Sequence, residues 1–182
     1  MTTLVCFLEE PSAKEMLKGI LPRLLQPGIH CVYIVFDGKQ DMDKQLIRKL
    51  RGWQKPDTAF LVLRDQDSTD CIVVKNRLTD MCREAITTDV LVRIACRELE
   101  SFYFGDLSAV EKGLGIENIA TQKRKAKYRI PDSIEKPSKE LEKLTKGSYQ
   151  KVSGSRSISQ YLSLENNTSH SFRVLLAGIQ RL

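Results

Sequence analysis

The sequence predicts an α/β domain built on a parallel sheet of about four strands, with helices on both faces. Four short apolar runs recur along the first hundred residues, and each of the first three is followed by a segment with apolar residues at helical spacing. The runs are continuously apolar rather than alternating, which is typical of parallel strands covered on both faces. The right-handed crossover rule then fixes the hand of the connections.

The strands are predicted at 4–8, 31–36, 60–63 and 90–96. The first helix is expected to begin at a capping box in which Ser12 caps the helix and Glu15 reaches back to it. The second helix is expected to be capped by Asp41. A third helical stripe runs through 71–85. These helices provide the crossovers that parallel strands require.

The last third of the chain differs in charge. Residues 1–120 carry 16 basic and 18 acidic side chains, whereas residues 121–182 carry 13 basic and 5 acidic ones. Helical patterns are expected there around 138–146, 156–164 and 169–180, the last capped by Ser169 or Ser171. A segment this short, with few large apolar side chains, would be only marginally stable if it folded alone. We therefore expect residues 1–120 to form the α/β core and residues 121–182 to form a basic helical appendix packed on it.

Composition narrows the class of protein. The chain has 182 residues, is 41% hydrophobic and 29% charged, and carries a net charge of +6. No run approaches the length of a membrane span, and the N-terminus lacks the features of a signal peptide, so we expect a cytoplasmic protein with no membrane partner. The five cysteines form no CxxC pair, which argues against a zinc site and indicates that the cysteines are free thiols.

Acidic residues follow three of the predicted strands. They are Glu9 and Glu10 after the first strand, Asp65 and Asp67 after the third, and Glu98 and Glu100 after the fourth. Ligand sites in open parallel sheets form beyond the carboxyl ends of the strands. Converging carboxylates repel one another, and Mg²⁺ or Mn²⁺ relieves that repulsion because hard cations prefer oxygen ligands. In Asp-x-Asp at a strand end, the side chains of Asp65 and Asp67 can point to the same side and share one ion, but a helix N-cap role for Asp67 is an alternative.

The order of a glutamate and then a DxD motif resembles the signature of Toprim domains, which occur in topoisomerases, primases and overcoming-lysogenization-defect nucleases. Across residues 3–173 the chain resembles the domain-of-unknown-function family 4276, a Toprim-like group. The matching blocks are LVCFLEEPSAKEML, YIVFDGKQDMDKQLIRKLRGW, FLVLRDQDSTDC, RIACRELESFYFGDLSAVEKGLG and NNTSHSF, of which RELESFYFGDL is the most specific. The resemblance implies a Toprim fold, which is a Rossmann-like parallel sheet flanked by helices.

The resemblance also implies roles for single residues. Glu9 matches the glutamate that acts as general acid or base or as a metal ligand, and Asp65 and Asp67 match the metal ligands of the DxD motif. Glu100 matches the later acid that completes a second metal site, with Glu98 as the second choice. Two metal ions about 4 Å apart would clamp the attacking and leaving oxygens of a phosphodiester.

The chain departs from the family pattern beside the first glutamate. Relatives usually have a glycine directly after it and another glutamate three residues later, whereas Glu10 and Ala13 occupy those positions here. Glu10 or Glu15 would have to compensate for a second metal to bind. This departure motivates an alternative function, a non-catalytic interaction or regulatory subunit of an ATPase complex.

Basic residues in two places are candidates for nucleic-acid binding. Those near the predicted sheet edge are Lys39, Arg64 and Lys75, and those in a basic run are Lys123, Arg124, Lys125 and Lys127. Phosphate contacts require such side chains, although a charge run of this kind is also typical of a solvated loop.

The resemblance favours a Mg²⁺-dependent nuclease, or a related phosphodiester-cleaving enzyme, acting on DNA or RNA. It implies the effector of a prokaryotic antiphage defence system that works with an AAA/ABC-type ATPase. The chain has no GxxxxGK[ST] motif, so we expect that ATPase to be a separate protein. A further alternative, a receiver-like phosphoacceptor, would need a fifth strand followed by a lysine.

Overall fold

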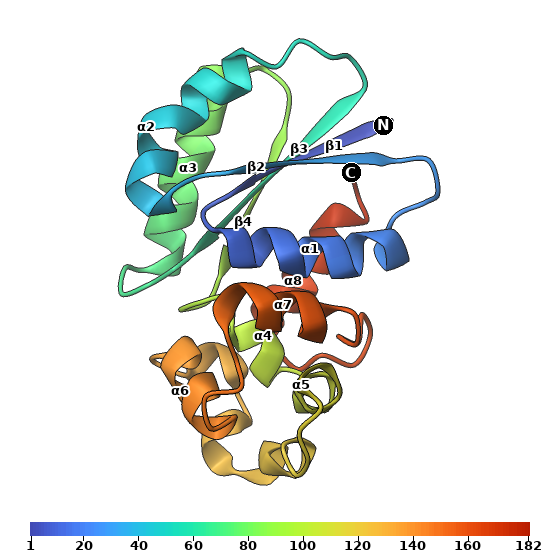
Figure 1. The fold of residues 1–182 in the computed structure, drawn as a ribbon. Coiled ribbons are helices and arrows are strands. Elements are labelled where there is room, and N and C mark those ends of the chain that lie inside the picture. Colours follow the sequence, from blue (N-terminus) through green and yellow to red (C-terminus); the bar gives the residue numbers. More distant parts are fainter.

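A computed structural model describes all 182 residues. Four parallel strands form one sheet in the order β2-β1-β3-β4 (Figure 1). They are β1 (Thr3–Leu8), β2 (His30–Val35), β3 (Thr58–Asp65) and β4 (Val90–Ala95). The predicted parallel sheet is therefore confirmed. It has no fifth strand, so the receiver-like alternative loses its structural basis.

Helices cover both faces of the sheet. The crossover helices are α1 (Pro11–Leu24), α2 (Gly38–Arg51) and α3 (Cys71–Ala85). Helices α2 and α3 lie on one face, whereas α1 lies on the other together with the last helix, α8 (His170–Ile179), which packs against β4 (Figure 1). No helix is both long enough and apolar enough to cross a bilayer.

A helical region lies below the sheet in Figure 1. It contains α4 (Ser101–Phe104), α5 (Leu107–Leu114), α6 (Pro137–Leu144) and α7 (Lys151–Ser159), with the 3₁₀ turns η1 (Ala120–Arg124), η2 (Ala126–Tyr128) and η3 (Pro131–Ser133). Sequence patterns missed α4 and α5 and placed α7 five residues too late, because low-propensity residues such as Gly154 weaken its helical signal. The predictions for α6 and α8 are correct within two residues, and Ser169 caps α8.

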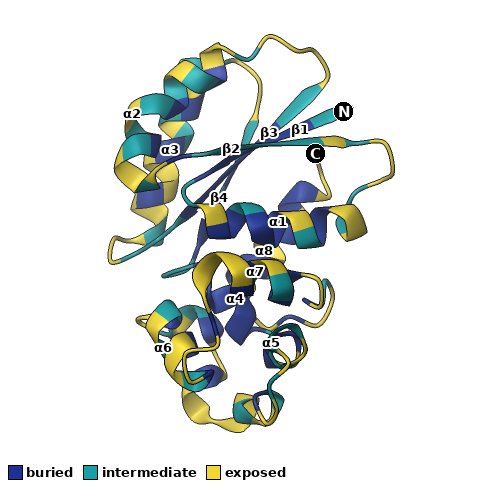
Figure 2. Cartoon of the chain, in the orientation of Figure 1, coloured by how far each residue is buried: buried dark blue, intermediate teal, exposed yellow.

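The sheet separates two layers of core, as the pattern of burial shows (Figure 2). In β1, Leu4, Cys6 and Leu8 face α1 and α8, whereas Val5 and Phe7 face α2 and α3, and all five are fully buried. This alternation is the period of two that a strand imposes. Burying each large apolar side chain in this way contributes about 1.5–3 kcal/mol to the free energy of unfolding.

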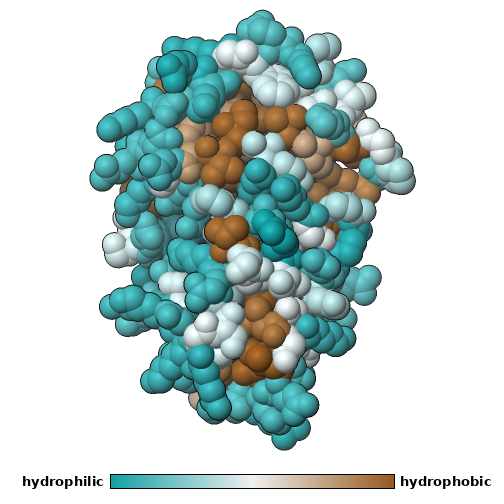
Figure 3. Space-filling view, in the orientation of Figure 1, coloured by the Kyte–Doolittle hydropathy of each residue, from teal (hydrophilic) through white to brown (hydrophobic).

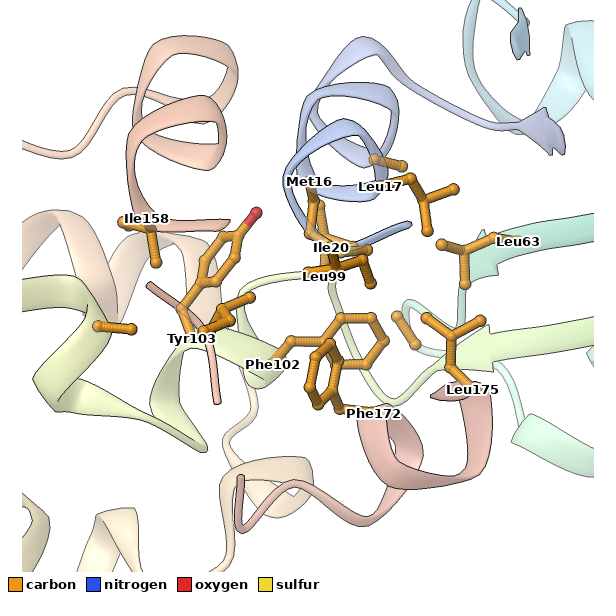
Figure 4. Packing of buried hydrophobic residues seen from close by; sticks show 14 of the residues in the cluster. Met16, Leu17, Ile20, Leu63, Leu99, Phe102, Tyr103, Ile158, Phe172 and Leu175 are labelled. Carbon is orange, nitrogen blue, oxygen red and sulfur yellow. The ribbon is translucent and has the colours of Figure 1, made fainter. Parts of the chain in front are cut away.

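The helical region continues the core on the α1 side. Phe102 packs on Phe172 with ring centroids 5.2 Å apart, and Tyr103 lies beside Ile158 of α7 (Figure 4). These residues belong to the same buried cluster as Leu4 of the central strand. Residues from the last third of the chain, such as Ile158 and Phe172, therefore share a core with the sheet. Whether residues 121–182 can fold alone stays a prediction.

The predicted capping box at the first helix is wrong. The helix begins at Pro11, whose fixed φ suits the first helical position. Ser12 consequently lies inside the helix, and its buried hydroxyl has no hydrogen-bond partner. Glu15 instead accepts a hydrogen bond of 2.6 Å from Arg156 Nε, which joins α1 to α7.

The predicted cap of the second helix is also displaced. Helix α2 begins at Gly38, three residues before Asp41. Gly38 has a φ of 78°, a conformation that glycine adopts without strain, so the chain turns into the helix directly after β2. The Asp41 carboxylate accepts the backbone N–H of Asp37 at 3.1 Å from inside the first turn. Helix α3 agrees with its prediction and is capped by Asp70.

Candidate metal centre

Four carboxylates converge at the carboxyl edge of the sheet. Glu9 and Glu10 follow β1, Asp65 ends β3, and Glu100 follows β4. Parallel pairing brings them together, because Leu8 pairs with Leu63 and Asp65 pairs with Ala95. Burial, with the charges of Glu10, Glu100 and Glu9, raises the pKa of Asp65 well above its usual range. We call Glu9, Glu10, Asp65 and Glu100 the acidic site.

Glu9 is fixed from two directions. Its Oε2 accepts the backbone N–H of Asp65 at 3.1 Å and lies 3.8 Å from Arg64 Nε. Burial raises its pKa, although the hydrogen bond from Asp65 and the Arg64 charge act in the opposite direction. The carboxylate is thus held in place while its charge is only partly compensated, an arrangement suited to a cation.

Glu100 is fully buried, and one of its oxygens has no partner. Its Oε1 accepts a hydrogen bond of 2.8 Å from the Tyr149 hydroxyl, whereas Oε2 is buried without any hydrogen bond. Burial raises its pKa. A buried carboxylate oxygen without a partner is costly, and a bound cation would offset that cost. Carboxylate oxygens are the donors that a hard divalent cation prefers, so the residue types at this edge, though not the present arrangement of their side chains, suit such an ion.

Lys151 of α7 also reaches the acidic site. Its Nζ donates to both carboxylate oxygens of Glu10, at 3.2 and 3.4 Å. Burial lowers the pKa of Lys151, but the charges of Glu100, Glu10 and Asp65 outweigh burial and raise it overall. Sequence reasoning missed this residue because no motif surrounds it. Only the packing of α7 against α1 places it at the sheet edge.

Asp67 has a different neighbourhood from Asp65. Strand β3 ends at Asp65, and Asp67 has a φ of 57°. The strand therefore does not continue through Asp67, although the Asp67 charge still acts on Glu9, and an ion shared by Asp65 and Asp67 stays a prediction. The Asp67 carboxylate accepts a hydrogen bond of 2.7 Å from Lys39 Nζ. It does not cap α3, since Asp70 performs that role.

Glu98 has a structural role. Its Oε2 accepts the backbone N–H of Ser138 at 2.7 Å and so satisfies a donor at the start of α6. Glu100, the first choice for the later acid, is the residue that enters the acidic site. With the side chains as placed, no group of three or more His, Cys, Asp or Glu residues is arranged to hold a metal ion.

The predicted phosphate-binding residues are scattered. Arg64 is buried and donates to Asp43 Oδ1 at 2.7 Å, so it stabilises the fold and is not available to a phosphate. Lys39 is paired with Asp67 at the sheet edge, and Lys75 is exposed on α3. The residues of the basic run, Lys123, Arg124, Lys125 and Lys127, are exposed on η1, η2 and the residue between them. That segment lies at the end of the helical region farthest from the sheet and does not rim the acidic site (Figure 1).

Comparisons with known proteins agree with this architecture. The model of a family described as Domain of unknown function (DUF4276) matches residues 8–180. The C-terminal region of the Burkholderia pseudomallei OLD protein aligns with a TM-score of 0.58 and 14% identity, covering 98% of this chain and 97% of that one.

A second structure, the C-terminal region of the Xanthomonas campestris pv. campestris OLD protein, has a TM-score of 0.49 and 14% identity, with coverage of 98% and 94%. Among curated proteins, none has a significantly similar sequence. At these identities, the likeness to the Burkholderia structure establishes a shared fold.

Proposed function

This chain belongs to the DUF4276 family and has the Toprim-like fold of the OLD C-terminal region, and on that premise we propose that it is a Mg²⁺- or Mn²⁺-dependent nuclease. The observation that carries the proposal is the acidic site, where the half-buried Glu9 and Asp65 and the buried Glu100 all have raised pKa values and one oxygen of Glu100 is unpaired. Such clusters of perturbed groups are typical of functional sites.

The carboxylates and the lysine of this site would have different roles. Glu9, Asp65 and Glu100 would hold the cation, because the charges of Glu9 and Glu100 both act on Asp65. A bound Mg²⁺ supplies polarisation of a phosphodiester and a more acidic water. Lys151 keeps an ammonium group beside Glu10, where it would stabilise negative charge that develops on a phosphate.

The test is cleavage of plasmid, single-stranded DNA and tRNA with Mg²⁺ or Mn²⁺. We expect an Asp65→Ala, Asp67→Ala double variant to lose at least about 100-fold in rate, because a metal site depends on its ligands. Asp89→Ala is the matched control, since Asp89 is exposed just before β4, at the opposite edge of the sheet. Equal cleavage by the double variant and the wild type would remove the catalytic role.

We also propose that the protein is the effector of a prokaryotic antiphage defence system and acts in the cytoplasm with a separate AAA/ABC-type ATPase. Support comes from the fold shared with the OLD C-terminal region. An ATPase gene beside this one, and stimulation of cleavage by its product, are the expected results. Full activity of the chain alone, unchanged by that ATPase, would contradict the partnership.

A second candidate function is a non-catalytic subunit of an ATPase complex. It is favoured by two internal ion pairs, Lys39 with Asp67 and Lys151 with Glu10, which neutralise carboxylates without a metal. Calorimetry distinguishes the two functions. Absence of Mg²⁺ or Mn²⁺ binding at millimolar ion would favour the subunit, whereas binding that Asp65→Ala abolishes would favour the nuclease.

A further inference from the structure

We infer that Tyr149 is a positioning residue, whose hydroxyl fixes the Glu100 carboxylate so that the unpaired oxygen stays available to a divalent cation. The inference rests on the proposed function and adds to it a residue outside the acidic site. Tyr149 lies in the loop between α6 and α7, in the last third of the chain. It would make the helical appendix a direct part of the metal centre.

The contact between the two side chains is short and shielded from water. The Tyr149 hydroxyl donates to Glu100 Oε1 at 2.8 Å, and both residues are buried. One donor on one oxygen restricts rotation of the carboxylate and leaves Oε2 unpaired. A phenol donates without adding charge, so Tyr149 fixes the Glu100 carboxylate without cancelling its charge, which is left for Lys151 or a cation to balance. An ordinary phenol has a pKa of about 10 and keeps its proton at neutral pH, so the Tyr149 hydroxyl has a proton to donate.

The position of the Tyr149 ring is itself fixed by its surroundings. Thr145 Oγ1 accepts the backbone N–H of Tyr149 at 3.1 Å, and the hydroxyl of Thr145 donates to the carbonyl of Leu141 at 2.8 Å. The Tyr103 ring packs beside it with centroids 6.0 Å apart. On another side the ring lies over Gly154 of α7, where an added Cβ would be 2.5 Å from Cδ2 of Tyr149. Residues of α6, α4 and α7 thus converge to hold one hydroxyl.

Outer-shell hydrogen bonds of this kind typically account for 10- to 100-fold in metal affinity. The first test is Tyr149→Phe in the full chain, with Mn²⁺ binding measured by calorimetry and cleavage measured over a range of Mn²⁺ concentrations. We expect Mn²⁺ affinity to fall by roughly 10- to 100-fold, and saturating Mn²⁺ to restore most of the cleavage rate. That separation of affinity from maximal rate is not expected of a variant that is merely less stable.

Tyr128→Phe is the matched control. Its hydroxyl donates to Glu140 at 2.5 Å, so this variant loses the same kind of bond at a place unconnected with the acidic site. We expect it to lower stability without changing Mn²⁺ affinity. Equal Mn²⁺ affinity in Tyr149→Phe and wild type, or an equal loss in both variants, would overturn the inference.

Gly154→Ala tests the same idea without removing a polar atom. The new methyl would push the Tyr149 ring by roughly 1 Å, since carbon atoms pack at about 3.5 Å or more. We expect it to weaken Mn²⁺ binding as Tyr149→Phe does, and the double variant to be little worse than either single variant. Additive losses would show that the two residues act separately and would overturn the inference. If the wild type binds no Mn²⁺, both the proposed function and this inference fail. If the wild type binds Mn²⁺ and none of these variants changes the affinity, only the role of Tyr149 is overturned.

Discussion

The contact between α1 and α7 at Gly19 makes a quantitative prediction possible. A Cβ at position 19 would lie 2.1 Å from Ser159 Oγ, 2.6 Å from Ser159 Cβ and 2.9 Å from the Ser159 backbone carbon. The last of these atoms cannot turn away, so Gly19→Ala forces α7 to move. Because α7 carries Lys151, the displacement would also reach the acidic site.

The expected loss follows from two opposing effects. Overpacking of a tight interface costs about 1–3 kcal/mol. Alanine in the interior of a helix is more favourable than glycine by about 1 kcal/mol, which offsets part of that cost. Because one close contact is with the backbone, the overpacking cost should lie in the upper part of that range, about 2–3 kcal/mol. We therefore expect a net loss of about 1–2 kcal/mol, which corresponds to roughly 2 to 8 °C in melting temperature for a chain of this size.

Urea and thermal unfolding measure the loss directly. Ser159→Gly removes two of the three close atoms, so the double variant should recover part of the stability and reveal a coupling energy between the two positions. Gly52→Ala is the matched control, since Gly52 is exposed and its nearest atom would be 3.3 Å from the new Cβ. A Gly19→Ala variant as stable as wild type, or no coupling with Ser159→Gly, would refute the close packing of α7 on α1.

Three further predictions concern charge and domain structure. The hydrogen bond from Arg156 lowers the pKa of Glu15, so its contribution to stability should be present above the ordinary glutamate pKa and lost as pH falls through the lowered value. Glu15→Gln should therefore cost about 0.5–1 kcal/mol in urea unfolding at neutral pH, and that cost should vanish as pH falls below the lowered value. Because the pKa values in the acidic site are raised, cation binding should displace protons, and Mg²⁺ affinity should therefore rise with pH. Calorimetry in buffers of different ionisation enthalpy should detect the released protons. A Mg²⁺ affinity that does not depend on pH would contradict this prediction. Residues 121–182 expressed alone should show no cooperative melting, and residues 1–120 alone should be less stable than the full chain, because the two segments share one buried cluster.

The hydrophobic surface of the molecule shows which strand remains uncovered. Apolar atoms are visible between the helices that flank β2, the edge strand of the sheet (Figure 3). The side chains of β2 from Cys31 to Val35 are half-buried, in contrast to those of the central strand β1. The continuous apolar pattern predicted both as strands, but only their place in the sheet order decided which of them lies inside.

The sequence by itself determined the sheet and the approximate place of its acidic site. Runs such as 4–8 and 60–63 are apolar on both faces, which requires cover on both sides, and the acids that follow them must meet because parallel strands end at one edge. Glu9 and Asp65 were therefore predictable from their position after a strand. Glu100 entered through its resemblance to a family motif, since the same local pattern would have admitted Glu98 equally well.

Tertiary structure decided which groups complete the site. Glu98 and Glu100 differ because α6 begins beside Glu98 and Tyr149 lies beside Glu100, and neither partner is near them in the sequence. Lys151 reaches Glu10 because Gly19 lets α7 approach α1 closely, so its role depends on a contact between two helices. Local sequence fixes the period and the ends of a strand through short-range sterics and hydrogen bonding, whereas the partners of a buried carboxylate are fixed by how distant segments pack.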